Sequence, residues 1–369
     1  MYLEEKDVDS IACGAMFLGS GGAGDTTVLQ IMAKQAIHDN GPVRLLSPFE
    51  LQDDAWVVSM SMMGSPAVHY EKMMSGHELI MALRLLEEEK QIKARALIAL
   101  EIGGINAITP ILAAALTGLP LVDADGMGRA FPECQMTTFH AFGAEARPFI
   151  ICADNGKCQR YLHPSTIEIE RAARISMTNM GGSVALASFP MTGKLLQEAA
   201  IHHTFSVCKR IGESVLAAGS SVQRVYSSLA AELQNSIYGK PCKLIEGRIV
   251  ELQRYLQDGF LRGELLVEGS GFHHTEQVEI EFQSEYLLAR QGERIVATVP
   301  DLICILEADS GLPLMIDELE KQMKVWVIAI PCPIILRHPK MLDFVGPWNF
   351  EVGDSYVPVE QRFSEEGSG

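Results

Sequence analysis

The sequence has no excess of positive charge and no long apolar run. Acidic residues outnumber basic ones by 47 to 30, which gives a formal net charge of -17 over 369 residues. A chain of this sign attracts neither phosphate backbones nor anionic lipid, so we expect no nucleic-acid and no membrane partner. No segment approaches the roughly 20 apolar residues that span a bilayer. The first residues, "MYLEEKDVDS", lack the basic segment and apolar core of a signal peptide, which predicts a cytoplasmic protein.

The signature motifs of several enzyme classes are also missing. The chain has no GxSxG nucleophile elbow, no GK[ST] phosphate loop and no HExxH or HxH metal pattern. Its eight cysteines include no CxxC pair, and several stand in apolar runs such as "IAIPCPII". This usage predicts reduced, mostly buried thiols rather than a disulfide framework.

What the sequence does contain is an alternation of short apolar strands and helices. Strands are predicted over 56–63, 96–101 and 119–123, with helices over 72–91 and 107–118 between them. This order predicts parallel βαβ units, preceded by a helix, a glycine-rich loop and a second helix. A hairpin turning at Asn155-Gly156 and a helical stretch over 193–233 follow.

After residue 240 the pattern changes to short alternating runs that are typical of antiparallel strands. We therefore predict an α/β protein, with an N-terminal three-layer domain that has a largely parallel sheet (1–240) and a smaller β-rich domain (241–335). The segment 336–369 is expected to return over the body, with its last residues disordered.

Charged residues concentrate directly after the third predicted strand. "GLPLVDADGMGRAFPECQM" (118–136) carries Asp123, Asp125, Arg129 and Glu133. Loops that follow parallel strands meet at one sheet edge, so Glu101, which follows the second strand, is expected beside them, as is loop 64–72. The aspartates suit general base catalysis or a divalent metal, and Arg129 suits a substrate carboxylate. The structural alternative is a turn at Asp125-Gly126 with Arg129 neutralising the aspartates.

The glycine-rich loop "GSGGAGDTT" (19–27) offers free backbone N–H groups that suit an anion, with Asp25 or Thr26 capping the next helix. The alternative is a tight turn between two packed helices.

Seven motifs in this order resemble the S-methyl thiohydantoin desulfurase family. They are "FLGSGGAGD", "GSPAVHYEK", "EIGGIN", "LPLVDADGMGRAFPE", "FQSEYLLA", "VPDLI" and "VGPWNF", which together run over about residues 7–358. The sequence departs from the family pattern at Ala23, where a fourth consecutive glycine is usual, and at Ser284, where asparagine is usual.

The resemblance implies a hydrolase that converts a 2-methylthio-imidazolone ring to a hydantoin with release of methanethiol, in the breakdown of S-methylated ergothioneine. Asp123 or Asp125 would then activate water, directly or through a divalent metal, while Glu133 or Glu101 protonates the ring nitrogen or the leaving thiolate. The residues implied in substrate binding are Arg129, Gly21, Gly22, Gly24, Asp25 and Asn106.

The alternative is a noncatalytic subunit or ligand-binding module that works with a hydantoinase- or oxoprolinase-type partner. The expected partners are a small-molecule ring substrate and either further copies of this chain in a homo-oligomer or a hydantoinase-type protein. The polar residues within "FQSE" and "PDLI" interrupt apolar strands, which predicts either a turn or a contact in which the β-rich part covers the cleft at the loop 123–133.

Overall fold

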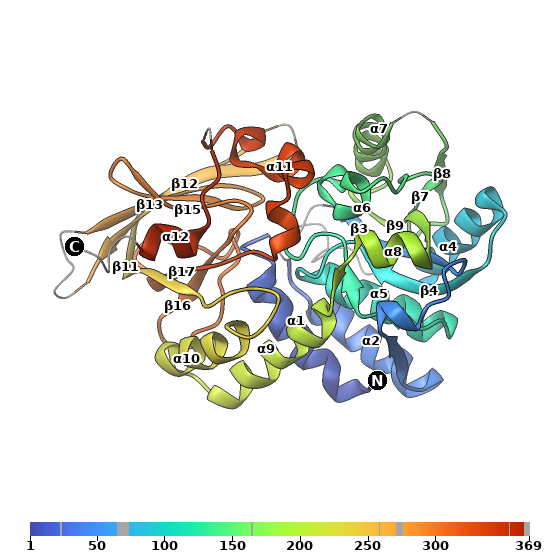
Figure 1. Cartoon of the computed structure of the whole chain (residues 1–369), viewed down its shortest axis with the longest axis horizontal. Helices are drawn as coiled ribbons and strands as arrows, with labels where there is room; N and C mark the ends of the chain where they lie inside the picture. Colours follow the sequence, from blue (N-terminus) through green and yellow to red (C-terminus); the bar gives the residue numbers. More distant parts are fainter. Residues whose placement is uncertain are drawn as a thin grey trace.

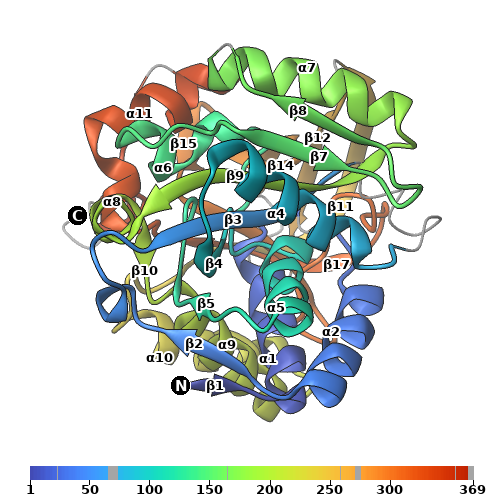
Figure 2. The same ribbon diagram turned by 90° about the vertical axis from the view of Figure 1, so that its right-hand side faces the viewer.

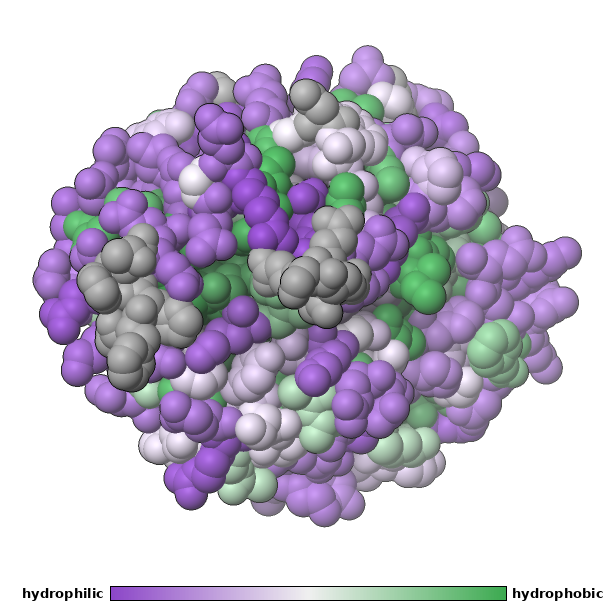
Figure 3. All heavy atoms as spheres, turned by 60° about the vertical axis from the view of Figure 1, so that its left-hand side comes forward, coloured by the Kyte–Doolittle hydropathy of each residue, from purple (hydrophilic) through white to green (hydrophobic). Residues whose placement is uncertain are grey.

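The computed structural model describes residues 1–22, 24–64, 74–163, 165–257, 259–270, 276–353 and 355–364. Two bodies lie side by side in it, a helix-rich one and a β-rich one (Figure 1). Within the described residues no helix is long and apolar enough to cross a membrane. Hydrophilic residues dominate the face seen in Figure 3, as the net charge leads one to expect.

The first sheet runs in the order β1-β2-β5-β4-β3-β9-β7-β8. Its strands are β1 (Tyr2–Leu3), β2 (Val43–Leu46), β3 (Trp56–Gly64), β4 (Ala94–Ala99), β5 (Leu121–Val122), β7 (Phe149–Cys152), β8 (Cys158–Tyr161) and β9 (Ser183–Thr192). The predicted parallel part is confirmed in β2, β5, β4 and β3. Strands β1, β9, β7 and β8 extend it on both sides with antiparallel pairing.

Helices cover this sheet and join it to the second body. They are α1 (Glu5–Leu18), α2 (Thr27–Asn40), α4 (His77–Lys90), α5 (Ile105–Thr117), α6 (Thr138–Ala141), α7 (Thr166–Asn179), α8 (Gly193–Ala199), α9 (Thr204–Ala218), α10 (Val222–Leu233), α11 (Pro339–Val345) and α12 (Val359–Ser364). Short 3-10 turns are η1 (Pro48–Glu50), η2 (Cys134–Met136), η4 (Ile334–Arg337) and η5 (Pro347–Phe350). Because β3, β4 and β5 follow one another in one direction with right-handed crossovers, α4 and α5 lie on the same face (Figure 2). Helices α1 and α2 pack outside α5, and α9 packs on α1.

The second sheet is wholly antiparallel, in the order β15-β14-β13-β12-β11-β17-β16. Its strands are β11 (Cys242–Gln257), β12 (Phe260–Gly269), β13 (Gln277–Gln283), β14 (Glu285–Gln291), β15 (Arg294–Thr298), β16 (Leu302–Glu307) and β17 (Lys324–Ile330). The sheet curls, because β14 and β16 come into contact although four strands separate them in the order. The expected mixed α/β protein with a β-rich C-terminal part is thus confirmed.

Alternate side chains along a strand of the second sheet belong to different hydrophobic cores, and this explains how the two bodies join. On β16, Leu302, Cys304 and Leu306 belong to the main hydrophobic core, whereas Ile303 and Ile305 belong to a separate core within the curl. Successive side chains of a strand point to opposite faces, so "LICIL" is apolar throughout because both of its faces are buried. The main core is therefore continuous across both bodies.

Two shorter features complete the fold. β6 (Ala124–Asp125) pairs with β10 (Ile201–His202), which holds the loop after β5 against the start of α9. After β17 the chain returns over the first body, where α11 contacts α6 and η2, while α12 contacts β11 and β15. Residues 365–369, for which disorder was expected, lie outside the described residues.

The prediction that all cysteines are reduced is wrong at one pair. Cys152 and Cys158 form a disulfide across the β7–β8 hairpin, with a Cα–Cα distance of 4.1 Å. They stand opposite each other because the hairpin turns at Asn155-Gly156, as predicted. The other six cysteines are free, and five of these are buried.

Candidate active site

The ends of β3, β4 and β5 meet at one edge of the first sheet. Asn106, at the start of α5, joins two of these ends. Its Oδ1 accepts a hydrogen bond from the Met62 amide at 2.7 Å, and its Nδ2 donates to Glu101 Oε1 at 2.6 Å. Glu101 and Asn106, both proposed from the sequence, are thereby brought together at the predicted edge. Loop residues 65–73, which include most of "GSPAVHYEK", lie outside the described residues.

Glu101 is a partly exposed carboxyl group at this edge. Its second oxygen, Oε2, accepts from the Phe131 amide at 3.3 Å. Burial raises the pKa of Glu101 to about 7, and the negative charge of Asp125 adds to the rise, although the bonds from Asn106 and Phe131 oppose it. A carboxyl group with this pKa exchanges a proton near neutral pH.

Asp125 is fully buried beside Glu101. Its Oδ2 accepts from the amides of Met127 and Gly128 at 3.0 and 2.8 Å. Its Oδ1 has no hydrogen bond of normal geometry within the described residues, although the Thr204 hydroxyl and the Ile102 amide lie close enough to the carboxyl group to lower its pKa. Burial raises the pKa of Asp125 to about 7, although these hydrogen-bond donors lower it. One oxygen of a rigidly held carboxyl group is thus left without a partner.

Glu285, at the start of β14, adds a third carboxyl group from the second body, and sequence reasoning did not place it in the site. Burial raises its pKa to about 8, with a further rise from Glu101 and an opposing effect of Arg129 and Arg174. Its Oε2 has no hydrogen-bond partner among the described residues. The only sequence signal was its place in "FQSE", a polar interruption between two apolar strands.

We call Glu101, Asp125 and Glu285 the acidic cluster. Their charges act on one another, as Glu101 feels Asp125 and Glu285 feels Glu101. Burial and these like charges both favour the protonated forms. The cluster can therefore hold a base and an acid at the same time, which is what hydrolysis requires.

Arg129 is a buried residue that joins the two bodies through hydrogen bonds. The residue is 0% exposed, and its guanidinium donates to the main-chain carbonyls of Ala130, Asp301 and Tyr286 at 3.0, 2.8 and 3.3 Å. A further contact reaches the Pro300 carbonyl at 3.4 Å. This geometry supports the structural role for Arg129 rather than a grip on a substrate carboxylate. It also confirms that "PDLI" contacts the loop 123–133, and the charge of Glu285 in "FQSE" acts on Arg129 in that loop.

Asp123 accepts hydrogen bonds at the start of α9. Its Oδ1 accepts from the Ser206 amide at 2.9 Å, its Oδ2 accepts from the Ser206 hydroxyl at 2.5 Å, and His203 Nδ1 lies 3.5 Å from Oδ2. Asp123 therefore caps a helix, which is a structural use of a carboxylate.

The aspartates do not fit a divalent metal. Both oxygens of Asp123 are bonded to Ser206, and Asp125 has a single oxygen to spare. Within the described part of the chain, no group of three or more His, Cys, Asp or Glu residues could hold a metal ion. The geometry thus gives no support to the metal that the sequence suggested for Asp123 and Asp125.

The glycine-rich loop packs against the second body. Gly21, with a φ of +88°, accepts from the Ile316 amide at 3.0 Å, and a Cβ there would lie 2.4 Å from the Tyr286 ring. A Cβ on Gly22 would lie 2.6 Å from Glu285 Oε1. The loop therefore needs glycine so that Glu285 can approach, which matches the alternative of a tightly packed turn more closely than an open anion site.

The last sequence candidates lie at the margins of the site. Gly24 adopts a φ of +67°, and Asp25 is exposed and accepts from the Thr27 amide and hydroxyl at 2.8 and 2.6 Å, so it caps α2. Glu133 precedes η2, and burial together with the charge of Glu170 raises its pKa. The charges that act on Glu133 are thus those of Glu170, Arg174 and Arg171 on α7, and Asp25 lies at the start of α2.

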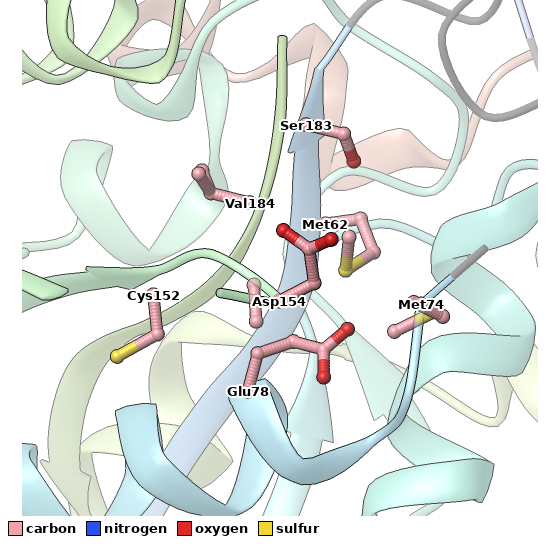
Figure 4. Close-up of a pocket in the computed structure, with 8 residues that line it drawn as sticks. Met62, Met74, Glu78, Cys152, Asp154, Ser183 and Val184 are labelled. Carbon is pink, nitrogen blue, oxygen red and sulfur yellow. The ribbon is translucent and has the colours of Figure 1, made fainter. Parts of the chain in front are cut away.

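A small pocket of about 10 Å³ lies at the same sheet edge and includes Met62, the residue bonded to Asn106. Figure 4 shows the Asp154 carboxylate beside Met62 and pointing away from Glu78, whose carboxylate lies on the side of Met74. Glu78 accepts from the Ser75 amide and hydroxyl at 3.1 and 2.7 Å. Sequence reasoning missed both acids, since neither belongs to a strand-end loop of the parallel part.

Family models match nearly the whole chain. The N-terminal domain of S-Me-THD-like proteins matches residues 6–161, and the C-terminal domain matches residues 164–359. The chain belongs to the S-Me-THD-like family. This confirms the resemblance seen in the order of the motifs. Both matched regions contribute to the acidic cluster, Glu101 and Asp125 from the first and Glu285 from the second.

Comparison with other proteins adds support for the fold alone. No curated protein matches the chain. An X-ray structure of a protein from Chromobacterium violaceum matches with a TM-score of 0.79 and 22% identity, over 97% of this chain and 100% of that one. The two-body arrangement is therefore shared by an experimentally determined structure.

Proposed function

We propose that this S-Me-THD-like chain is a hydrolase that removes the methylthio group from an S-methyl thiohydantoin or a similar ring. Water supplies the oxygen of the hydantoin product, and the sulfur leaves as methanethiol. The observation that carries the proposal is the acidic cluster: three carboxyl groups from both bodies, two of them buried and one partly exposed, each with a pKa raised toward neutrality.

The reaction needs one base and one acid. The carbon that bears sulfur is bonded to two ring nitrogens, so it resembles an amidine carbon. Attack by water forms a C–O bond and breaks the C=N π bond, and the base moves one water proton toward the ring nitrogen. Collapse of the tetrahedral intermediate forms the C=O group and breaks the C–S bond, and the second water proton ends on the leaving thiolate. General acid and base groups accelerate such steps by about 10²- to 10⁴-fold each when they are positioned by the protein.

The roles follow from exposure and pKa. Glu101 is the partly exposed member, so we assign it the proton of the attacking water. Glu285 has the highest pKa, about 8, so it is protonated at neutral pH and is assigned as the acid for the thiolate. Asp125 is fully buried and acts as a positioning residue, because its charge raises the pKa of Glu101.

The pH dependence of kcat/KM tests this assignment. Activity requires ionised Glu101 and protonated Glu285, so kcat/KM should rise with pH through about 7 and fall above about 8. A rate that increases steadily with pH to 10 would contradict the assignment of Glu285 as the acid.

The decisive experiment incubates the purified full chain with S-methyl thiohydantoins and measures methanethiol with a thiol reagent, with and without chelator. We expect release by the isolated chain and retention of activity in chelator. Glu101→Gln should lower turnover at least about a hundredfold, whereas the exposed Glu268→Gln on β12 should not change it. If the isolated chain releases no methanethiol, the alternative of a noncatalytic subunit with a hydantoinase-type partner gains support.

A further inference from the structure

The side-chain amide of Asn106 spends its donors within the protein. Its Nδ2 donates to Glu101 Oε1 at 2.6 Å and to the Met62 carbonyl at 3.3 Å, while its Oδ1 accepts from the Met62 amide at 2.7 Å. An amide nitrogen has two hydrogens, so these two bonds use both of them. The residue is 8% exposed and lies in the first turn of α5. An amide bonded in this way is better suited to hold another side chain than to bind a substrate.

The backbone of Met62 fixes the direction in which the Asn106 amide points. A backbone N–H can only donate and a carbonyl can only accept, so Oδ1 must face the first and Nδ2 the second. Met62 is itself held in β3, where it pairs with Ala185 of β9. Turning the amide over would place donor against donor and acceptor against acceptor. Asn106 therefore always presents an N–H group to Glu101 Oε1.

The two carboxyl oxygens of Glu101 are held unequally. Oε1 receives the short bond from Asn106 at 2.6 Å, whereas Oε2 accepts from the Phe131 amide at 3.3 Å, beyond the usual range for such a bond. Each oxygen of an ionised carboxyl group can accept two hydrogen bonds. Among the described residues, the Phe131 amide is the one donor to Oε2, so this oxygen keeps room for a proton from water.

Asn106 is the strongest local stabiliser of the ionised form of Glu101. The titratable and charged groups that act together with Glu101 are Asp125 on β6, Glu285 on β14, Arg129 in the loop 123–133 and Cys134 on η2. The two acids favour the protonated form of Glu101, Arg129 favours the ionised form, and burial keeps the thiol neutral by raising its pKa. After burial, the bond from Asn106 has the largest effect on the pKa of Glu101, and it lowers that pKa.

We infer that Asn106 is a positioning residue for the proposed base: it holds Glu101 as a carboxylate with Oε1 fixed, so that Oε2 is the oxygen that takes the proton of the attacking water. The inference rests on the proposed function for the source of that proton, whereas the link between Asn106 and Glu101 needs no substrate. Oε2 forms an O–H bond as the water oxygen bonds to the ring carbon, and it then passes the proton to the ring nitrogen. Glu101 is thereby a carboxylate again at the end of each cycle.

Two substitutions remove the N–H donor in different ways. Asn106→Asp keeps an acceptor for the Met62 amide but sets an oxygen against Glu101 Oε1, and the helix dipole favours a negative charge in the first turn of α5. Asn106→Ala removes the amide and suits a helix. Asn40→Asp is the matched control, because it removes a side-chain N–H that donates to a main-chain carbonyl at the exposed end of α2. Thermal melting confirms that each variant is folded.

Carbon-13 NMR of labelled glutamate carboxyl groups measures the pKa of Glu101, whose signal is identified by its loss in Glu101→Gln. We expect a value of about 7 in the wild type and in Asn40→Asp. In both variants at position 106 we expect it to lie at least about 1 pH unit higher, because losing a hydrogen bond to a charged group shifts its ionisation equilibrium by about tenfold or more.

The wild type supplies a second readout that needs no change at position 106. The side-chain N–H signals of Asn106, assigned through their proximity to the Met62 backbone, should move with pH as Glu101 titrates. In Glu101→Gln they should no longer move in this range. This measurement decides the link between the two residues if neither variant at position 106 folds.

Kinetics distinguish positioning from substrate binding. The acidic limb of the kcat/KM profile should move to higher pH in both variants by the same amount as the pKa of Glu101. In the Glu101→Gln background, Asn106→Ala should cost no further turnover, because Asn106 acts through Glu101. A residue that binds the substrate would instead raise KM, leave the limb in place and lower activity further in that background.

The outcomes separate the inference from the proposed function. An unchanged pKa of Glu101 in both folded variants overturns the inference, as do Asn106 N–H signals that titrate alike with and without Glu101. A selective rise in KM overturns it too and makes Asn106 a substrate ligand. If the wild type releases methanethiol while the pKa of Glu101 does not depend on Asn106, the inference fails and the proposed function stands. If that pKa does depend on Asn106 in a chain that releases no methanethiol, the link between the two residues is supported and the hydrolase is refuted.

Discussion

Replacing Glu285 by glutamine should make the folded protein more stable at high pH. The pKa of Glu285 rises from its ordinary value of 4.5 to about 8 in the folded chain. Each pKa unit corresponds to about 1.4 kcal/mol, so ionised Glu285 lowers the free energy of unfolding by at most about 5 kcal/mol at pH 9. Relaxation and water entry raise the effective dielectric around buried groups, and we therefore expect about 2 kcal/mol.

The direction follows from proton binding. The folded chain holds the Glu285 proton more tightly than the unfolded chain does, so this residue favours folding fully below about pH 4.5 and loses that contribution as the pH rises through about 8. Glu285→Gln is neutral at every pH. It should match the wild type within about 0.5 kcal/mol at pH 5 and exceed it by about 2 kcal/mol at pH 9.

Urea unfolding at pH 5, 7 and 9 measures this difference. The matched control is Glu268→Gln, which removes an exposed carboxylate from β12 of the same sheet and should show no such change with pH. A Glu285→Gln variant that is no more stable than the wild type at pH 9 would mean that this carboxyl group is stabilised in its charged form, and the account of the acidic cluster would be wrong.

Three further substitutions separate structural from chemical roles. Asp125→Asn removes the charge that raises the pKa of Glu101, so the acidic limb of the kcat/KM profile should move to lower pH; an unmoved limb would uncouple the two groups. Asp123→Asn weakens the cap of α9 and should lower the free energy of unfolding by about 1 kcal/mol, with kcat preserved in the folded enzyme. Arg129→Met removes the hydrogen bonds that join the bodies and should cost about 3 kcal/mol or more in urea unfolding; a selective rise in KM would instead restore Arg129 as a substrate ligand.

Local patterns in the sequence were sufficient to predict the parallel part of the first sheet and the edge where Glu101 and Asp125 meet. Strand, helix and loop follow one another within about 30 residues there, and right-handed crossovers leave little choice of topology. The sequence could not separate Asp123 from Asp125. What distinguishes them is Ser206, which lies 83 residues from Asp123 along the chain and takes up both of its oxygens.

Glu285 and the disulfide were missed for different reasons. Glu285 reaches the site because the second sheet docks on the glycine-rich loop, and such docking leaves no periodic signal in a single sequence. The Cys152–Cys158 pair did have a signal: a hairpin that turns at Asn155-Gly156 sets these two residues opposite each other. Cysteine usage over the whole chain indicated reduced thiols, whereas the predicted hairpin already placed Cys152 opposite Cys158.

The contacts between the bodies imply that the acidic cluster exists only when they are joined. Ser20, in the glycine-rich loop, exchanges hydrogen bonds with the backbone of Ile303 at 2.9 and 3.1 Å, and its carbonyl accepts from the Tyr286 amide at 2.8 Å. Arg129 adds its bonds from the other side of the interface. Burial is the largest cause of the raised pKa of both Glu101 and Glu285. Because joining the bodies buries Glu285 and brings its charge to Glu101, the groups that carry the proposed chemistry depend on the same interface that holds the fold together.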